Sequence, residues 1–161
     1  MRSAGQKAAG RAVAYRRVIA GLLAAGRDRD ALAEALRWLR GEAVHAERLR
    51  PRAAAALYGR LDSQVVSLAE ALTGPGGDGP APRQARRAAR HRQDLARLRA
   101  AGQHREVLAA TAGWLSSAAA AAARADPAAA AAVYGQLTER ISGLAEAVPG
   151  YRPDGRGGRH Q

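Results

Sequence analysis

The chain has 161 residues, of which 26 are basic and 14 acidic, so its formal net charge at pH 7 is +12. It contains no cysteine, which excludes disulfide bonds, thiolate catalysis and cysteine-ligated zinc sites. Leu, Val and Ile together make only 26 residues and Phe is absent, so any hydrophobic core is thin for a chain of this length. Alanine, the strongest helix former, fills the gap. The composition therefore favours helices that form readily but pack weakly.

Three helices are predicted in the first part of the chain, near residues 8–25, 28–48 and 51–72. Gly26 ends the first, because glycine readily adopts the left-handed conformation that closes helices. Pro51 begins the third, since proline is tolerated in a first helical turn. The middle helix has an apolar face at steps of four and three residues, made of Leu32, Leu36, Leu39, Ala43 and Ala46.

Residues 73–82 contain four glycines and three prolines and predict a linker that no helix crosses. Three more helices are predicted near residues 83–101, 104–124 and 127–148, with Gly102 closing the first of them and Asp126-Pro127 starting the last. Residues 149–161 are again rich in glycine, arginine and proline, and they predict a disordered basic tail.

The second half of the sequence repeats the first. Residues 11–72 align without a gap to residues 87–148 at a constant offset of 76, with 28 of the 62 positions identical. Thirteen of these matches are alanine and carry little weight, but the other fifteen include both tryptophans, Trp38 and Trp114, which align with each other. The repeat predicts a supersecondary unit that occurs twice in the chain. Each copy would bury its apolar face against its own helices or against the other copy.

The predicted fold is all-α, a tandem duplication of a three-helix unit with six helices in total. The first unit is residues 1–72 and the second is residues 83–148, joined by the linker at 73–82. Whether the two units stack into one body or sit apart is open. The thin core favours stacking or homo-oligomerisation, because a 62-residue unit poor in large side chains is marginally stable alone.

The repeated aromatic residues favour helix packing over a ligand pocket. Each predicted third helix carries a Tyr-Gly pair, Tyr58-Gly59 and Tyr134-Gly135, with a tryptophan upstream. We expect each indole ring to lie across the third helix of its unit. The glycine next to the tyrosine would then relieve crowding on that helix.

The strongest local excess of charge lies in residues 83–99, which contain seven arginines and one acid, Asp94. Five arginines fall within roughly 100° of one another on a helical wheel, namely Arg83, Arg86, Arg87, Arg90 and Arg97. The planar guanidinium pairs well with phosphate oxygens, and a row of them along a helix suits a polyanion. We therefore predict that these five residues bind the phosphate backbone of RNA or DNA, as part of a larger assembly.

Other basic residues extend this prediction, and the aromatic content limits it. The equivalent helix of the first unit offers Lys7, Arg11, Arg16 and Arg17, and the tail adds Arg152, Arg156 and Arg159. With only two tryptophans and four tyrosines, few rings are present to stack on bases, so sequence-specific readout is not expected.

Two other interpretations stay open. A GC-rich genome produces arginine in place of lysine without any selection for binding, and a basic helix face is often only a solvated face. Alternatively, the chain is a helical adaptor or structural subunit whose two related units contact a protein partner or further copies of the chain.

No catalytic, metal or cofactor site emerges from the sequence. The four histidines never occur at a metal-ligand spacing such as i, i+4. No serine has a histidine and an aspartate arranged around it in a known motif, and the glycine-rich linker lacks the lysine and hydroxyl residue of a phosphate-binding loop. We predict a protein that is not an enzyme and that uses no metal and no cofactor.

The sequence favours a cytoplasmic protein with no membrane partner. No stretch approaches the roughly 18 apolar residues of a membrane span. Residues 16–23 resemble the start of a signal peptide, but the apolar run is short, ends in Arg27-Asp28 and has its counterpart deep inside the chain.

Overall fold

The computed structural model describes residues 2–73 and 82–153. These residues form six α-helices, two short 3-10 helices and no strand, which confirms the prediction of an all-α chain with six helices. In chain order the elements are α1 (Ala4–Ala24), α2 (Asp28–Leu49), η1 (Pro51–Ala53), α3 (Ala54–Thr73), α4 (Pro82–Ala100), α5 (His104–Ala125), α6 (Ala130–Ala147) and η2 (Val148–Gly150). The predicted linker, except for its first and last residues, and the tail from residue 154 on lie outside the described residues.

Helix α1 begins four residues before the predicted start at residue 8. The Ser3 hydroxyl accepts a hydrogen bond from the backbone N–H of Gln6 at 3.1 Å, and the Gln6 side chain accepts one from the backbone N–H of Ser3 at 2.9 Å. This reciprocal capping box satisfies two N–H groups that otherwise lack partners at a helix start. The Ser-x-x-Gln pattern of this capping box is present in the sequence, and it explains why α1 begins earlier than predicted.

Two glycines end α1 and α4, as their positions predicted. Gly26 has φ +74° and Gly102 has φ +72°, a left-handed conformation that favours glycine. After each glycine the chain turns back on the helix, with the N–H of Arg27 donating to Leu22 O at 2.9 Å and the N–H of Gln103 donating to Leu98 O at 3.0 Å. The two turns have the same geometry 76 residues apart.

The predicted start of the last helix at Pro127 is wrong by three residues. Asp126 is the C-cap of α5, and α6 begins at Ala130. The Asp126 carboxylate accepts a hydrogen bond from the N–H of Ala129 at 3.3 Å, so its side chain closes a turn between the two helices and does not cap α6 directly.

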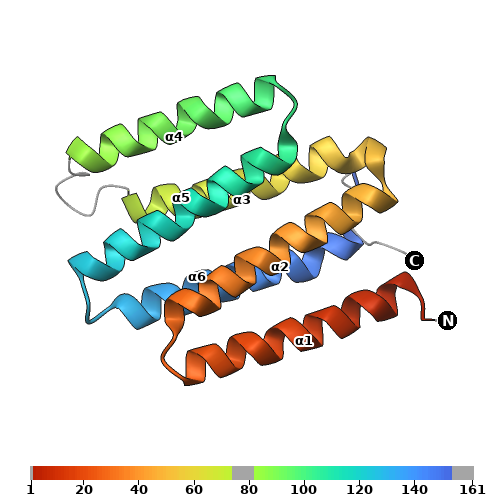
Figure 1. Cartoon of the computed structure of the whole chain (residues 1–161), viewed down its shortest axis with the longest axis horizontal. Helices are drawn as coiled ribbons and strands as arrows, with labels where there is room; N and C mark the ends of the chain where they lie inside the picture. Colours follow the sequence, from red (N-terminus) through yellow and green to blue (C-terminus); the bar gives the residue numbers. More distant parts are fainter. Residues whose placement is uncertain (1, 74–81, 154–161) are drawn as a thin grey trace, which may run out of the picture.

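The helices pair across the two halves of the sequence. Helix α2 packs along α6, and α3 packs along α5, whereas α2 and α3, which follow each other in the chain, have much less contact. Helix α1 packs against α2 and α4 against α5, so these two helices lie at opposite edges of the molecule (Figure 1). All six helices contribute to one hydrophobic core. The two predicted units therefore form one body, while their exact boundaries stay a prediction.

The two tryptophans are buried in equivalent surroundings. Trp38 is 1% exposed and stacks on Tyr15 of α1, with ring centroids 5.3 Å apart. Trp114 is 3% exposed and stacks on His91 of α4, with centroids 5.1 Å apart. Both rings thus hold the outer helices, where offset stacking adds to the burial of apolar area. Each indole therefore stacks on a residue of the first helix of its unit, and its position across the third helix stays a prediction.

The glycines beside Tyr58 and Tyr134 do not relieve crowding. A Cβ atom built on Gly59 or Gly135 meets no atom of the described residues within 4 Å. Both positions lie inside α-helices, α3 and α6. In an unstrained helix, glycine only adds entropy to the unfolded chain.

The chain after α6 stays on the core for a few residues more. Val148 is buried within η2, and Tyr151 is half-buried. Arg50 Nη1 donates to Tyr151 O at 2.9 Å, and the Arg60 guanidinium lies 5.7 Å from the Tyr151 ring centre. The prediction of disorder from residue 149 on therefore does not hold for its first residues, 149–151.

None of the helices in the described ranges is long and apolar enough to cross a membrane.

Replacing Gly59 with Ala is expected to raise the free energy of unfolding by about 0.5–1 kcal/mol, because alanine loses less backbone entropy on forming a helix. Urea denaturation followed by circular dichroism measures the change. The matched control is Gly26→Ala, which is expected to lower stability because alanine is strained at φ +74°. A loss of stability in Gly59→Ala would contradict the open surroundings of this position.

Candidate nucleic-acid interface

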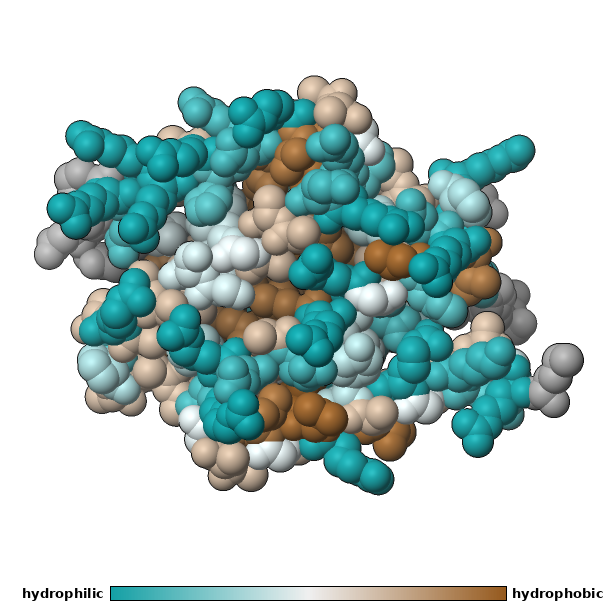
Figure 2. Space-filling model, viewed as in Figure 1, coloured by the Kyte–Doolittle hydropathy of each residue, from teal (hydrophilic) through white to brown (hydrophobic). Residues whose placement is uncertain are grey.

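The five arginines predicted to bind phosphate all lie on α4, and all five are exposed. The opposite side of α4 faces the core through the buried residues Ala88 and Leu95. Hydrophilic side chains gather along the upper edge of the molecule, where α4 lies (Figure 2). The structure thus places the predicted residues on one outward-facing surface, named here the α4 arginine row, which consists of Arg83, Arg86, Arg87, Arg90 and Arg97.

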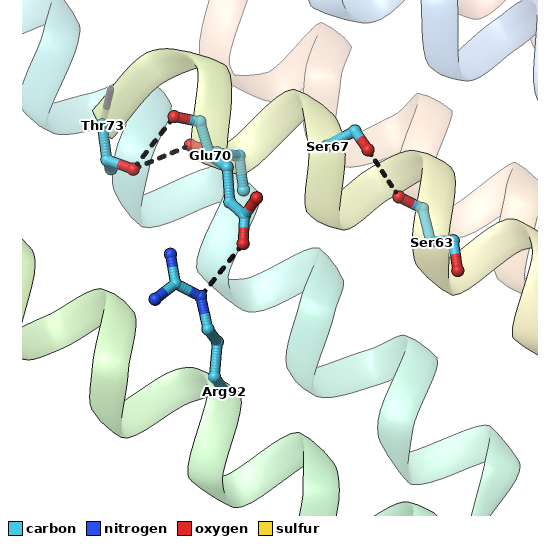
Figure 3. Close-up of polar contacts among 6 residues, drawn as sticks. Ser63, Ser67, Glu70, Thr73 and Arg92 are labelled. Atoms are coloured by element: carbon cyan, nitrogen blue, oxygen red, sulfur yellow. Dashed lines mark hydrogen bonds and ion pairs between the residues drawn. The ribbon is translucent and has the colours of Figure 1, made fainter. Parts of the chain in front are cut away.

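Two further arginines of α4 face α3 and fix the helix in place. Arg92 Nε donates to Glu70 Oε1 at 3.0 Å, an interaction visible in Figure 3. Arg99 pairs with Asp62, which is 1% exposed. These two residues belong to the same arginine-rich segment, but their charges are compensated by acids of the neighbouring helix.

The α4 arginine row itself is mostly uncompensated. Arg97 pairs with Asp94 one helical turn away, at 2.9 Å. Within residues 2–73 and 82–153, the other four members have no carboxylate within ion-pair distance. Four guanidinium groups on neighbouring turns therefore concentrate positive charge along one side of α4.

The equivalent helix of the first half does not offer such a surface. On α1, Arg11 pairs with the buried Glu42 through two hydrogen bonds of 2.8 and 3.0 Å. Arg16 pairs with Glu139 at 2.9 Å and with Glu146, and its guanidinium also lies 5.8 Å from the Trp38 ring centre. The sequence prediction that α1 extends the basic surface through these two residues is therefore wrong.

The other basic residues that the sequence analysis added to the predicted surface are exposed where the structure describes them. Lys7 and Arg17 on α1 are exposed, as is Arg152 after η2. Arg156 and Arg159 lie outside the described residues.

Sequence reasoning missed the buried carboxylate Asp62. Its oxygens accept hydrogen bonds from Arg99 and from the Thr111 hydroxyl, which brings together α3, α4 and α5. A buried carboxylate requires such partners, because its desolvation is otherwise prohibitive. The signal was available: Asp62 shares a face of α3 with Tyr58 and Val65, at steps of four and three residues.

A second polar cluster, centred on the half-buried Glu47, links α2, α3 and α5. The Tyr58 hydroxyl donates to Glu47 Oε1 at 3.0 Å, and Arg105 Nε donates to the same oxygen at 2.7 Å. The hydrogen bond from Arg105 lowers the pKa of the Glu47 carboxyl. Burial, reinforced by the bond to Glu47, raises the pKa of the Tyr58 phenol to about 12.

His91 faces the core beneath the α4 arginine row. Burial lowers its pKa, and Arg87 and Arg90 lower it further, although Asp94 opposes them. The neutral ring suits its stack on Trp114. His91 thus supports α4 from below and adds no positive charge to the surface at neutral pH.

Within the described residues, no three His, Asp or Glu side chains gather closely enough to hold a metal ion. The predictions of no metal and no cofactor stay predictions.

Comparisons with known proteins give no relative: no family model, no curated protein and no solved structure matches this chain.

Raising the pH from 10 to 12 is expected to lower the free energy of unfolding by about 2 kcal/mol. The Tyr58 phenol ionises near pH 10 in the unfolded chain but only near 12 in the folded one, and each pKa unit corresponds to about 1.4 kcal/mol. The stabilisation is therefore complete below pH 10 and is lost as the pH rises through 12. Urea denaturation at several pH values measures it.

The Tyr58→Phe variant isolates this effect from the other tyrosines. Its stability should depend less on pH between 10 and 12 than that of the unchanged chain. Equal pH dependence of the two proteins would show that Tyr58 ionises normally.

Proposed function

We propose that this protein is a non-enzymatic accessory protein that contacts the phosphate backbone of nucleic acid through the α4 arginine row, as a subunit of a larger assembly. The observation that carries the proposal is the set of four exposed arginines on α4 without an acidic partner in the described part of the chain, namely Arg83, Arg86, Arg87 and Arg90.

The spacing of these residues supports contact with an extended polyanion. Arg83 and Arg97 are separated along the helix by about 21 Å, at roughly 1.5 Å per residue. Arginines three or four residues apart lie on successive turns of one face. Such a row can pair with several phosphates of one nucleic-acid molecule and release their counterions, which is the main source of affinity in non-specific binding.

The aromatic side chains support binding without base recognition. Trp38, Trp114, Tyr58 and Tyr134 are each less than 5% exposed. Rings buried in this way cannot stack on bases. We therefore propose that the protein reads charge and shape rather than sequence.

We also propose that the chain is a tandem duplication of a three-helix unit. Positions 76 residues apart have matching surroundings: Arg16 of α1 pairs with Glu146, and Arg92 of α4 pairs with Glu70. The stacked pairs of Trp38 and Trp114 and the turns at Gly26 and Gly102 follow the same relation.

Divergence between the two halves supports a role for α4 in particular. Arg11 aligns with Arg87, but Glu42, which neutralises Arg11, aligns with Ala118. The second half thus has the arginine but an alanine at the position of its acid, and Arg87 is exposed on the α4 arginine row. The change increases the positive charge of α4 and not of α1.

The principal test replaces Arg83, Arg86, Arg87 and Arg90 together with Gln and measures binding to duplex DNA and to single strands over a range of salt concentrations. Removing one arginine–phosphate pair reduces the slope of log K against log salt by about 0.9 for B-DNA, so the slope of the variant should be smaller by up to about 3–4.

The matched control changes four other exposed arginines that lack ion pairs in the described ranges, Arg29, Arg40, Arg48 and Arg52, to Gln. The net charge falls equally in both variants. Equal loss of affinity in the two would contradict a localised interface, and absence of binding by the unchanged chain at low salt would remove the proposal.

A second candidate function is protein contact or self-assembly through α1. Val13 and Val18 on this helix are 60% and 49% exposed, and α1 lies at the edge of the molecule opposite α4 (Figure 1). Under this alternative, light scattering reports an oligomer for the unchanged chain and a monomer for a variant with Val13→Ser and Val18→Ser. The control is Ala14→Ser, at an exposed neighbouring position. A monomeric unchanged chain would contradict self-assembly through α1.

A further inference from the structure

A cavity of about 150 Å³ lies at the end of the molecule where both termini emerge (Figure 1). Four segments enclose it: the first turns of α1, the last turns of α2, the start of α3 and the chain around η2. Its walls are mostly alanine, glycine and leucine. The volume is close to that of an apolar protein cavity that holds one benzene ring, so it suits a small compact molecule rather than a lipid chain.

The polar wall of the cavity is a buried ion pair. Glu42 is 4% exposed, and both of its oxygens accept hydrogen bonds from Arg11 through Nε and Nη2. The remaining Nη1 group of Arg11 has no acceptor among the described residues. A guanidinium carries five N–H donors, so Arg11 keeps donors for a ligand after it has satisfied Glu42.

Two more basic side chains line the same cavity. His45 is half-buried, and Arg50 is exposed at the mouth, where it uses only Nη1 to bind Tyr151 O. Arg11 and Arg50 against the single carboxylate of Glu42 leave a net charge of at least +1. An apolar cavity with one excess positive charge favours a ligand with an apolar body and one negative charge.

The exposure of Leu49 supports a ligand with an apolar body. This leucine lines the cavity yet is 62% exposed, which is the largest exposure among the large hydrophobic side chains of the described residues. A ligand in the cavity would cover part of it and gain from burying that surface.

We propose that this cavity binds a small apolar monocarboxylic acid. The ring or branched chain lies against the alanines and Leu49, and the carboxylate accepts hydrogen bonds from Arg11 and Arg50. The cavity includes no residue of the α4 arginine row, so this proposal is tested independently of nucleic-acid binding.

The test uses the full chain and benzoate as the probe, with calorimetry for affinity and amide NMR shifts for location. Benzyl alcohol is the neutral counterpart and acetate is the carboxylate without an apolar body. Benzoate is expected to bind more tightly than either, with shifts confined to the residues around the cavity.

Two variants with matched controls localise the binding. Ala46→Leu fills the cavity and should abolish benzoate binding, whereas Ala33→Leu, on an exposed part of α2, should leave it unchanged. Arg50→Gln removes the guanidinium at the mouth together with its hydrogen bond to Tyr151 O. It should weaken benzoate binding by about tenfold, and unchanged binding of benzyl alcohol shows that the wall around η2 is intact. Arg48→Gln is its control.

The proposal is overturned if benzoate shows no saturable binding, if Ala46→Leu binds it as well as the unchanged chain, or if benzyl alcohol binds as tightly as benzoate. A loss of benzoate binding in Arg48→Gln equal to that in Arg50→Gln would also overturn it, since only general charge would then be involved.

Discussion

The packing of α2 on α6 and of α3 on α5 is the constraint on which the rest of the structure depends. A chain with 26 Leu, Val and Ile residues and no Phe has little apolar surface to bury, and a small unit with so few large side chains gains little stability from its own core. By pairing helices across the halves, the molecule brings this limited surface into one cluster that draws on every helix. Alanine at the contacts allows the close approach that this pairing requires.

Arginines in this molecule either pair with an acid and join two helices, or lack such a partner among the described residues and form part of a charged surface. Arg16 and Arg92 tie the outer helices α1 and α4 to the inner ones through equivalent glutamates, and Arg11 and Arg99 do so through buried carboxylates. Such pairs are well compensated, because each buried charge has a partner. Where no acid of the described residues pairs with the arginine, as at Arg87, the same residue type becomes part of a charged surface.

The helices were predictable from the sequence because their signals are local. Gly26 and Gly102 ended helices as expected, and the apolar face of Leu32, Leu36 and Leu39 is buried. The pairing of helices was not predictable, because the same apolar faces fit a partner in either half. The exposure of the α4 arginine row followed from helical periodicity, whereas the neutralisation of Arg11 and Arg16 depends on acids 31 to 130 residues away.

Because α2 pairs with α6 and α3 with α5, the order in which the helices are synthesised affects folding. A ribosome completes α2 and α3 before α5 and α6 exist, so the faces of α2 and α3 that these two helices later cover stay in water while the second half is made. Contacts between segments so distant in sequence are slow to form, because a long loop must close first. The nascent first half therefore depends on its charge and its intrinsic helicity to avoid aggregation until translation of α5 and α6 supplies the missing surfaces.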